Sequence, residues 1–261
     1  GIKVFGLSRN EKSLEKLERY DAQKIFWNEK SLLNFSLVDN KINFVLSTVP
    51  PNNMGNDPVL KIFNKKLSQY KGWLGYISST SVYGGENNEI IDENSECLPL
   101  TTRGITRLKI EREWLNFGSE IFRVAGIYGF KRSPFEKLPD KKTYVIDKEN
   151  HVFNRIHIDD LVAIIIKSYT NPRPKRIINI SDGNPCNQID FYREACRISN
   201  SKMPKIYKID EIKMSDMQKS FWLSSKYIVS SILKNEFNYD FIHPDYKSGL
   251  KSIWKNEKLN F

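Results

Sequence analysis

Long hydrophobic runs are lacking in this sequence, which argues against a membrane-spanning helix. Such a helix needs about 18 or more mostly apolar residues. The longest apolar stretch in the 261 residues is LVAIIIKSY at 161–169, and charged residues flank it. We also expect no secretory leader, because residues 1–5, GIKVF, resemble a strand and not a charged start followed by an apolar run. We therefore expect a cytoplasmic protein with no membrane partner.

Cysteine and histidine are scarce, and neither shows the spacing of a metal site. The three cysteines, Cys97, Cys186 and Cys196, form no C-x-x-C pair, and the three histidines are scattered along the chain. An odd number of unpaired cysteines fits a reducing compartment, in which thiols act as ordinary small side chains. We expect no bound metal.

Acidic residues are outnumbered, with 31 Asp and Glu against 41 Lys and Arg, a formal net charge of +10. A basic excess can mark a nucleic-acid-binding surface. Here the lysines are spread out in short pairs such as Lys65 and Lys66, and no basic run is interleaved with aromatic residues. We therefore expect solvated basic faces and no nucleic-acid partner. A positive field would still attract phosphorylated small molecules. The oligomeric state is left open.

Short apolar strands alternate with helical patterns through residues 1–129. Strands are expected at 2–8, 23–27, 43–51, 72–80 and 120–129. Helices are expected at 10–20, 28–35, 58–70 and 101–117. Continuous apolar strands alternating with helices are typical of a parallel sheet that is covered on both faces. We predict an α/β fold with a Rossmann-like, doubly wound parallel sheet, which would bind ligands at the carboxyl ends of its strands.

The alternation loosens after Gly129. One strand is expected within 130–150, a strand that runs into a helix at 154–171, a strand at 175–183 and a helix at 187–199. Asp159 or Asp160 is expected to cap the helix that follows His157. We predict a dinucleotide-binding part at 1–129 and a smaller substrate-side subdomain at 130–261, interleaved with the last strands of the sheet.

Five motifs occur in a familiar order along nearly the whole chain. They are ISSTSVYGG at 77–85, FRVAGIYGFKR at 122–132, RIHIDDLVAII at 155–165, NISDGNP at 179–185 and FIHPDYKSGL at 241–250. Together they resemble the extended and atypical short-chain dehydrogenase/reductases, the nucleotide-sugar epimerase/dehydratase superfamily. The last motif resembles the ending of a bacterial nucleoside-diphosphate-sugar epimerase-like branch. The resemblance implies NAD(P) binding and a phosphorylated or nucleotide-linked substrate. In that family His157 and Asp159 would form a latch between the two halves.

The family's glycine-rich dinucleotide motif is lacking. No G-x-x-G-x-x-G or G-x-G-x-x-G occurs, and residues 1–10, GIKVFGLSRN, match the family's second strand. Such a loop holds the pyrophosphate at a helix N-terminus. We expect that the first strand, the loop and the first helix, about 30 residues of a βαβ unit, are missing and that the chain is a fragment.

The family's catalytic pair is also altered. Its helix carries Tyr as the proton donor and Lys four residues later, whereas this chain reads RGITRLKIE, with Arg103 and Arg107 at those two positions. Spacing of i and i+4 puts both on one helix face. A guanidinium stays protonated near neutral pH, so Arg103 cannot replace the Tyr as a general acid, but it binds phosphate or carboxylate with paired donors. The resemblance makes Ser79 the third catalytic residue. Tyr83 is either a substitute acid or a packed aromatic residue, and Tyr128 has the same two interpretations.

The strand ends are rich in small and hydroxyl residues that suit close approach by a cofactor. In the family, a basic residue after the second strand binds the 2′-phosphate of NADP. In this sequence Arg9 stands at that position beside Ser8, with no acidic residue nearby. We therefore expect NADP in preference to NAD. The resemblance implies cofactor contacts from Ser8, Arg9, Thr48, Val49, Pro50, Ser78, Arg107 and Gly126.

Two functions remain open at this point. One is an NADP-dependent oxidoreductase or epimerase-type enzyme. The other is a non-catalytic NADP-binding sensor or interaction module that lost the Tyr. The Arg pair favours the second, whereas Ser79 and the strand-end motifs favour the first.

Overall fold

The computed structural model describes residues 3–85 and 88–258, so Ile2 of the expected first strand lies outside the described residues. The chain forms two compact units. The N-terminal unit comprises Gly1–Val45 and Val49–Gly72, and the large unit comprises Leu46–Thr48 and Trp73–Phe261. We describe each unit by itself. No helix among the described residues is both long and apolar enough to cross a membrane.

The N-terminal unit holds a two-stranded parallel sheet of β1 (Phe5–Ser8) and β2 (Gln23–Phe26). The expected helix between these strands is α-helical only at α1 (Glu11–Glu15) and continues as a 3-10 helix over Lys16–Tyr20. Two further helices follow, α2 (Glu29–Asn34) and α3 (Pro58–Gln69). Asp57 caps α3, because its carboxylate accepts hydrogen bonds from the amides of Val59 and Leu60 at 2.7 and 3.0 Å.

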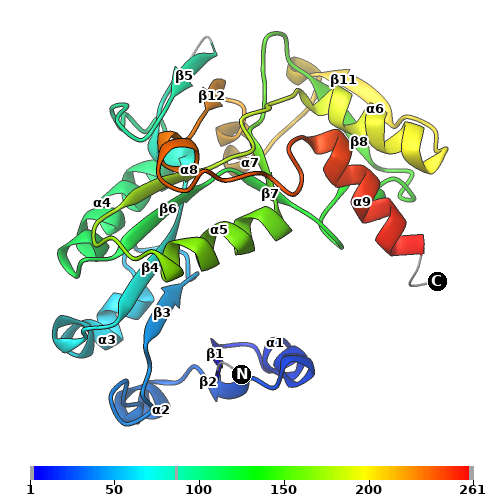
Figure 1. The fold of residues 1–261 in the computed structure, drawn as a ribbon. Coiled ribbons are helices and arrows are strands. Elements are labelled where there is room, and N and C mark those ends of the chain that lie inside the picture. The colour runs from blue at the N-terminus through cyan, green and yellow to red at the C-terminus, as the bar shows by residue number, and fades with distance from the viewer. Residues whose placement is uncertain (1–2, 86–87, 259–261) are drawn as a thin grey trace. The chain divides into compact units, whose positions relative to one another are not determined.

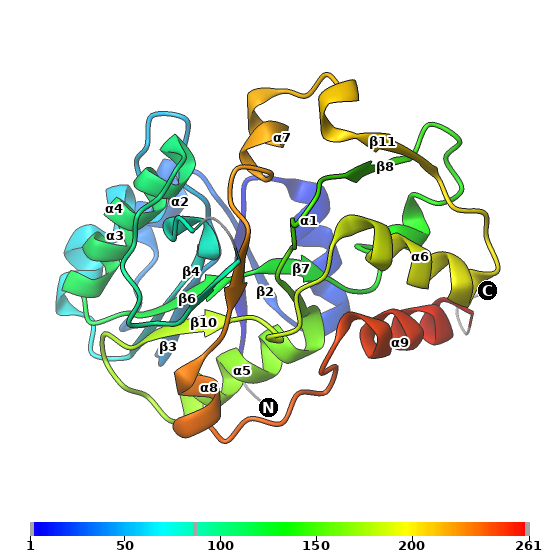
Figure 2. The ribbon, with the colours of Figure 1, turned by 90° about the horizontal axis from the view of Figure 1, so that it is seen from above.

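The main sheet of the large unit contains four strands in the order β10-β6-β4-β3. The bounds of these strands are Ile177–Ile180, Glu120–Val124, Trp73–Ser79 and Phe44–Ser47. The β10–β6 and β6–β4 pairs are parallel, so the carboxyl ends of these three strands lie at one edge of the sheet (β4 and β6 in Figure 1, β10 in Figure 2). This arrangement confirms the predicted α/β fold with parallel sheets. We call this edge the carboxyl edge and the opposite one the amino edge.

Helices pack on both faces of the main sheet. On one face lies α4 (Thr102–Asn116), where the rings of Trp114 and Tyr76 stack with centroids 5.5 Å apart. On the other lie α5 (Ile158–Thr170) and α8 (Ser231–Asn235), shown from above in Figure 2. The core on that side is built from Phe122, Val124, Leu161, Ile164, Ile178, Ile180 and Leu233. Burial of both faces explains why these strands are continuous apolar runs.

The single strand expected at 120–129 is in fact two strands in different sheets. β6 ends at Val124, and β7 (Gly126–Tyr128) pairs with β9 (Arg155–His157). The chain crosses between the sheets at Ala125. The Ala125 amide donates to the Ile180 carbonyl, and the next amide, that of Gly126, donates to the Asn154 carbonyl, both at 3.0 Å.

Two more parallel strand pairs and several helices complete the large unit. The pairs are β8 (Tyr144–Asp147) with β11 (Lys205–Lys208), and β5 (Glu89–Ile91) with β12 (Lys226–Ile228). The remaining α-helices are α6 (Gln188–Ser199), α7 (Asp216–Ser220) and α9 (Tyr246–Lys258). Short 3-10 helices occur at η2 (Thr80–Val82), η3 (Pro134–Glu136) and η4 (Ile209–Glu211). The chain passes from one compact unit to the other at 45/46, 48/49 and 72/73. The functional division predicted at 129/130 stays a prediction.

One expected helix cap is wrong. The helix α5 is capped by His157, whose Nδ1 accepts a hydrogen bond from the Asp159 amide at 3.2 Å. Asp159 and Asp160 instead lie in the first turn, where their charge favours the positive helix end. Histidine is an unusual cap, because the usual N-cap residues are Ser, Thr, Asp and Asn.

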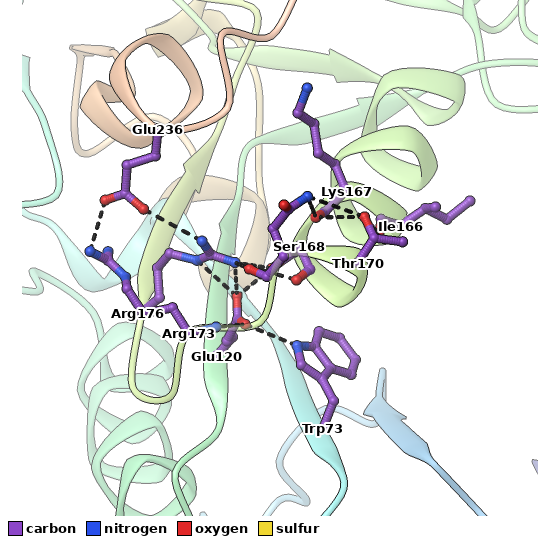
Figure 3. Close-up of polar contacts among 10 residues, drawn as sticks. Trp73, Glu120, Ile166, Lys167, Ser168, Thr170, Arg173, Arg176 and Glu236 are labelled. Carbon is purple, nitrogen blue, oxygen red and sulfur yellow. Dashed lines mark hydrogen bonds and ion pairs between the residues drawn. The ribbon is translucent and has the colours of Figure 1, made fainter.

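A saturated polar network fixes the amino edge of the main sheet (Figure 3). Glu120, at the start of β6, accepts hydrogen bonds from Arg176 Nε and Nη2 at 3.0 and 2.8 Å. The same carboxylate accepts from the Trp73 indole, the Arg173 amide and the Ser168 hydroxyl. Glu120 and Arg176 are almost fully buried. Each charge is therefore paired and hydrogen-bonded, as a buried ion pair requires.

Candidate functional site

The strand β4 leads directly into a turn against which α4 packs. A Cβ atom at Gly104 would lie 2.3 Å from the Ser81 carbonyl oxygen and 2.8 Å from Pro99 Cβ, so only glycine fits this close approach. Thr101 caps α4 by accepting from the Gly104 amide at 3.0 Å. The glycine and the cap thus bring the first turns of α4 to the carboxyl end of β4, with Arg103 and Arg107 on the helix.

Arg107 is buried without a carboxylate partner among the described residues. Its side chain is 8% exposed, and Nη1 donates to the Ile77 carbonyl at 2.9 Å and approaches the Tyr76 hydroxyl at 3.4 Å. Its Nε has no hydrogen-bond partner. A buried guanidinium that no anion neutralises is energetically costly. Arg107 is therefore a candidate to receive an anionic or oxygen-rich ligand.

Arg103 lies one turn earlier and is exposed to solvent. Partial burial and the nearby positive charge of Arg107 both lower the pKa of Arg103 from its usual value. The Arg103 guanidinium carbon lies 5.9 Å from the centre of the Phe221 ring. The two arginines thus form a pair of like charges, and a bound anion would relieve their mutual repulsion.

The two serines that end β4 have different surroundings. Ser79 caps η2, and its hydroxyl accepts from the Ser81 amide at 3.2 Å. Ser78 is buried and donates to Glu111 at 2.5 Å. Ser79 is only half-buried, so its hydroxyl proton remains available to a substrate oxygen. The catalytic role of Ser79 and the cofactor role of Ser78 stay predictions.

Tyr83 takes part in a closed network. Its hydroxyl donates to Asn179 at 2.9 Å and accepts from Arg123 Nη1 at 2.7 Å. Arg123 also forms an ion pair with buried Glu111, with Nη2 and Oε2 2.8 Å apart. Burial raises the pKa of Tyr83 to about 12. These contacts favour the packed-aromatic interpretation over the acid, because a general acid works best with a pKa near the operating pH. Tyr128 is also buried, and its pKa is likewise raised by burial.

Several buried polar atoms near the carboxyl edge have no hydrogen-bond partner. Ser47 ends β3, Ser81 follows β4, and Arg107 lies on the helix after that turn. The hydroxyl oxygens of both serines and the Arg107 Nε are buried and unpaired. Buried polar groups in proteins are nearly always paired with protein or water, so these atoms are free to contact a bound group. Ser47 and Ser81 were not singled out from the sequence, where only the hydroxyl-rich strand ends indicated them.

The predicted cofactor residues are divided between the two units. Ser8, Arg9, Val49 and Pro50 belong to the N-terminal unit. Thr48, Ser78, Arg107 and Gly126 belong to the large unit. Arg9, Thr48, Pro50 and Gly126 are exposed, which leaves them accessible to a cofactor. Their binding roles, and the preference for NADP, stay predictions.

A pocket of about 470 Å³ lies within the region predicted as the substrate side. Its lining combines aromatic rings and lysines, and includes Lys137, Lys142, Tyr144, Phe153, Phe221 and Trp222. The Phe221 ring is the one that approaches Arg103. The lining thus offers flat apolar surfaces and positive charge, both suited to an anionic ligand with a ring.

Lys226 was missed from the sequence. It is buried in β12, where its ammonium donates to the carbonyls of Tyr83 and Gly84 at 3.0 and 2.8 Å. Burial lowers its pKa to about 8. A single Lys in KYIVSS carries no pattern that would predict this position, since the contact joins residues more than 140 positions apart.

Comparisons with known proteins define the fold. No family model matches the chain, and no curated protein matches its sequence. A functionally unknown conserved protein from Silicibacter pomeroyi shares 26% identity and a TM-score of 0.89, with 99% of this chain and 91% of that chain covered. The dTDP-glucose 4,6-dehydratase of Bacillus anthracis, in complex with NAD, has a TM-score of 0.77 at 13% identity over 99% of this chain and 88% of its own.

A third structure, RMD from Pseudomonas aeruginosa complexed with NADPH, has a TM-score of 0.69 at 13% identity and covers 100% of both chains. The chain therefore has the Rossmann-like fold of the epimerase/dehydratase-type short-chain dehydrogenase/reductases. This result confirms the fold that the five sequence motifs predicted.

Proposed function

We propose that the protein binds a nicotinamide dinucleotide, preferably NADP, together with a phosphorylated or nucleotide-linked small molecule. In this proposal Arg103 and Arg107 bind the ligands' anionic and hydroxyl groups and do not transfer protons. The observation that carries the proposal is the buried Arg107, which lacks a carboxylate partner among the described residues and whose Nε is unpaired. The sequence resemblance puts it at the position of the family's Lys. The NAD and NADPH of the similar structures support a dinucleotide ligand.

In this proposal the two arginines have separate roles because they differ in burial and position. Arg107 lies deep beside the end of β4, where the ribose of a nicotinamide would replace its missing hydrogen-bond partner. Arg103 is exposed next to Phe221, which lines the aromatic and lysine-rich pocket. Arg103 would therefore contact the phosphate or carboxylate of the second ligand. Because Tyr83 is held in the Arg123 network, no ordinary Tyr-dependent reductase activity is expected.

Titration of the full chain with NADPH tests the role of Arg107. A charge-assisted hydrogen bond contributes about 1.5–3 kcal/mol, so Arg107→Ala should weaken NADPH binding by about 10- to 150-fold. Arg112→Ala, an exposed arginine on the same helix, is the matched control and should bind like the wild type. Equal binding by wild type and Arg107→Ala would remove Arg107 from the cofactor site.

Two further measurements test the preference for NADP and the expected absence of hydride transfer. Arg9→Asp should shift preference from NADP toward NAD, while the equally exposed Arg19→Asp should not. Assays with nucleotide-sugar substrates should detect no robust hydride transfer. A robust activity that collapses in Tyr83→Phe, but persists in Tyr128→Phe, would overturn the proposal and make Tyr83 the acid of an enzyme.

A further inference from the structure

Two of the three histidines of the chain meet in the large unit although 85 residues separate them in sequence. His157 ends β9, and His243 lies in the segment before α9. Their rings approach with centroids 3.9 Å apart, and both side chains are at least nine-tenths buried. Asp159 completes the cluster, with its carboxylate 54% exposed. Such a cluster is not visible as a sequence spacing, which is why the chain was expected to bind no metal.

Two of the distances within this cluster are close to those between ligands of one divalent ion. Asp159 Oδ2 lies 3.4 Å from His157 Nδ1 and 3.1 Å from His243 Nε2. One ligand atom from each residue lies within 4.8 Å of the other two. Zinc binds His nitrogen and carboxylate oxygen at about 2.0–2.2 Å, so neighbouring ligand atoms lie roughly 3.0–3.5 Å apart. We propose that His157, Asp159 and His243 form a binding site for a divalent transition-metal ion such as Zn²⁺.

The cluster is held in place by a residue that would not itself touch the ion. Asp160 is fully buried, and its carboxylate accepts hydrogen bonds from the His243 amide at 3.0 Å and the Ile242 amide at 2.7 Å. The Tyr239 hydroxyl donates to the same carboxylate at 2.9 Å. Asp160 thereby fastens the His243 segment to the first turn of α5, so the ligands are ordered before any ion arrives. Such ordering lowers the entropy lost on binding.

The accessibility of the cluster suits a metal. The exposed Asp159 carboxylate leaves an entry path from solvent, and water would complete the coordination around three protein ligands. In the metal-free chain the His157 Nδ1 lone pair caps α5 by accepting from the Asp159 amide. An ion at Nδ1 would replace this hydrogen bond.

The experiment uses the tag-free full chain and Zn²⁺ alone. At a hundredfold excess over its Kd, Zn²⁺ should raise the Tm by roughly 5–10 °C, and calorimetry should show one saturable site. Asp159→Asn and His243→Gln should each weaken Zn²⁺ binding by about 100-fold or more, since even residues behind the ligands contribute about 10- to 100-fold. Asp159→Asn changes only an exposed carboxylate, so it keeps the fold and makes the test decisive.

Matched controls separate this site from the three thiols and from unspecific binding. Asp216→Asn, in the first turn of α7, and His151→Gln, which removes the third histidine, should bind Zn²⁺ like the wild type. Co²⁺ bound to the chain should show a spectrum of nitrogen and oxygen ligands without the strong thiolate charge-transfer band. The absence of saturable Zn²⁺ binding would overturn the proposal, and so would equal binding by Asp159→Asn and wild type. Failure of this test leaves the dinucleotide proposal untouched, because Arg107 and Arg103 are not part of the cluster.

Discussion

The two edges of the main sheet differ in how their buried arginines, Arg176 and Arg107, are paired. At the amino edge, the carboxylate of Glu120 accepts from Arg176, Trp73, Arg173 and Ser168, so both of its oxygens are used (Figure 3). At the carboxyl edge, Arg107 has no carboxylate partner among the described residues, and its Nε is unpaired. Arg176 and Arg107 are each less than a tenth exposed. Their difference lies therefore in pairing and not in burial.

Asp182 extends this contrast. It follows β10 at the carboxyl edge and is 5% exposed. One of its oxygens accepts from the Asn184 amide at 2.9 Å, whereas Oδ2 has no partner. An unpaired buried polar group costs about 1–3 kcal/mol. A protein can retain such groups where a ligand completes them, so the unpaired edge is the one expected to bind.

The largest expected effect on stability comes from replacing Glu120 at the amino edge. Glu120→Gln removes the charge that neutralises buried Arg176 and should lower the free energy of unfolding by about 3–5 kcal/mol. Urea denaturation measures this loss. Glu113→Gln is the matched control, because Glu113 pairs with Lys109 at 3.9 Å on the exposed side of α4 and should contribute at most about 1 kcal/mol. Equal losses in the two variants would contradict the contrast between the edges.

The next largest effect is a pH dependence of the unfolding free energy that Asp182 causes at the carboxyl edge. Burial raises the pKa of Asp182 to about 7, whereas in the unfolded chain it is about 3.9. The folded state therefore holds this proton more tightly. Its contribution to stability is complete below about pH 4 and is lost as the pH rises to about 7, by up to about 4 kcal/mol.

Comparison with Asp182→Asn isolates this contribution. Between pH 4 and pH 7 the unfolding free energy of the wild type should fall relative to that of Asp182→Asn, because only the wild type has this carboxyl group to ionise. Urea titrations at several pH values measure it. Parallel pH profiles for the two proteins would show that Asp182 is paired in solution.

The smallest effect on stability is expected at Arg107. Replacing Arg107 by Met removes an unneutralised buried charge and two hydrogen-bond contacts, and these changes oppose one another. Without ligand, Arg107→Met should therefore change the unfolding free energy by less than about 1.5 kcal/mol, whereas Arg176→Met should cost about 3–5 kcal/mol. Thermal and urea denaturation of the two variants compare them directly. A loss of 3 kcal/mol or more in Arg107→Met would mean that Arg107 is structural.

Local pattern predicted most elements because the alternating apolar strands and helices carry their own signal. The strands β1 to β4 and the helices α3, α4 and α6 lie where the sequence placed them. The break between β6 and β7 was missed because FRVAGIYG is apolar throughout, and only the pairing partners of Ala125 and Gly126 reveal it. The strands β5 and β11 were missed because they are short and their partners are distant in sequence.

The same distinction between local pattern and long-range contacts applies to the candidate site. The register of RGITRLKIE alone placed Arg103 and Arg107 on one face of a helix, since helical spacing is a local property. Local spacing cannot show which arginine is buried, or that Tyr83 contacts Arg123 and Asn179. Each of those facts depends on residues at least 30 positions away.

The sequence by itself determined the class of fold, the order of most of its elements and the helical spacing of Arg103 and Arg107. Periodicity and motif order are encoded in neighbouring residues, so they can be read without coordinates. The tertiary structure decided which buried charges are neutralised and which are left open, and it brought His157, Asp159 and His243 together. The free energy of a buried polar group depends on its partners and its solvent. Both are supplied by distant parts of the chain and exist only once the chain has folded.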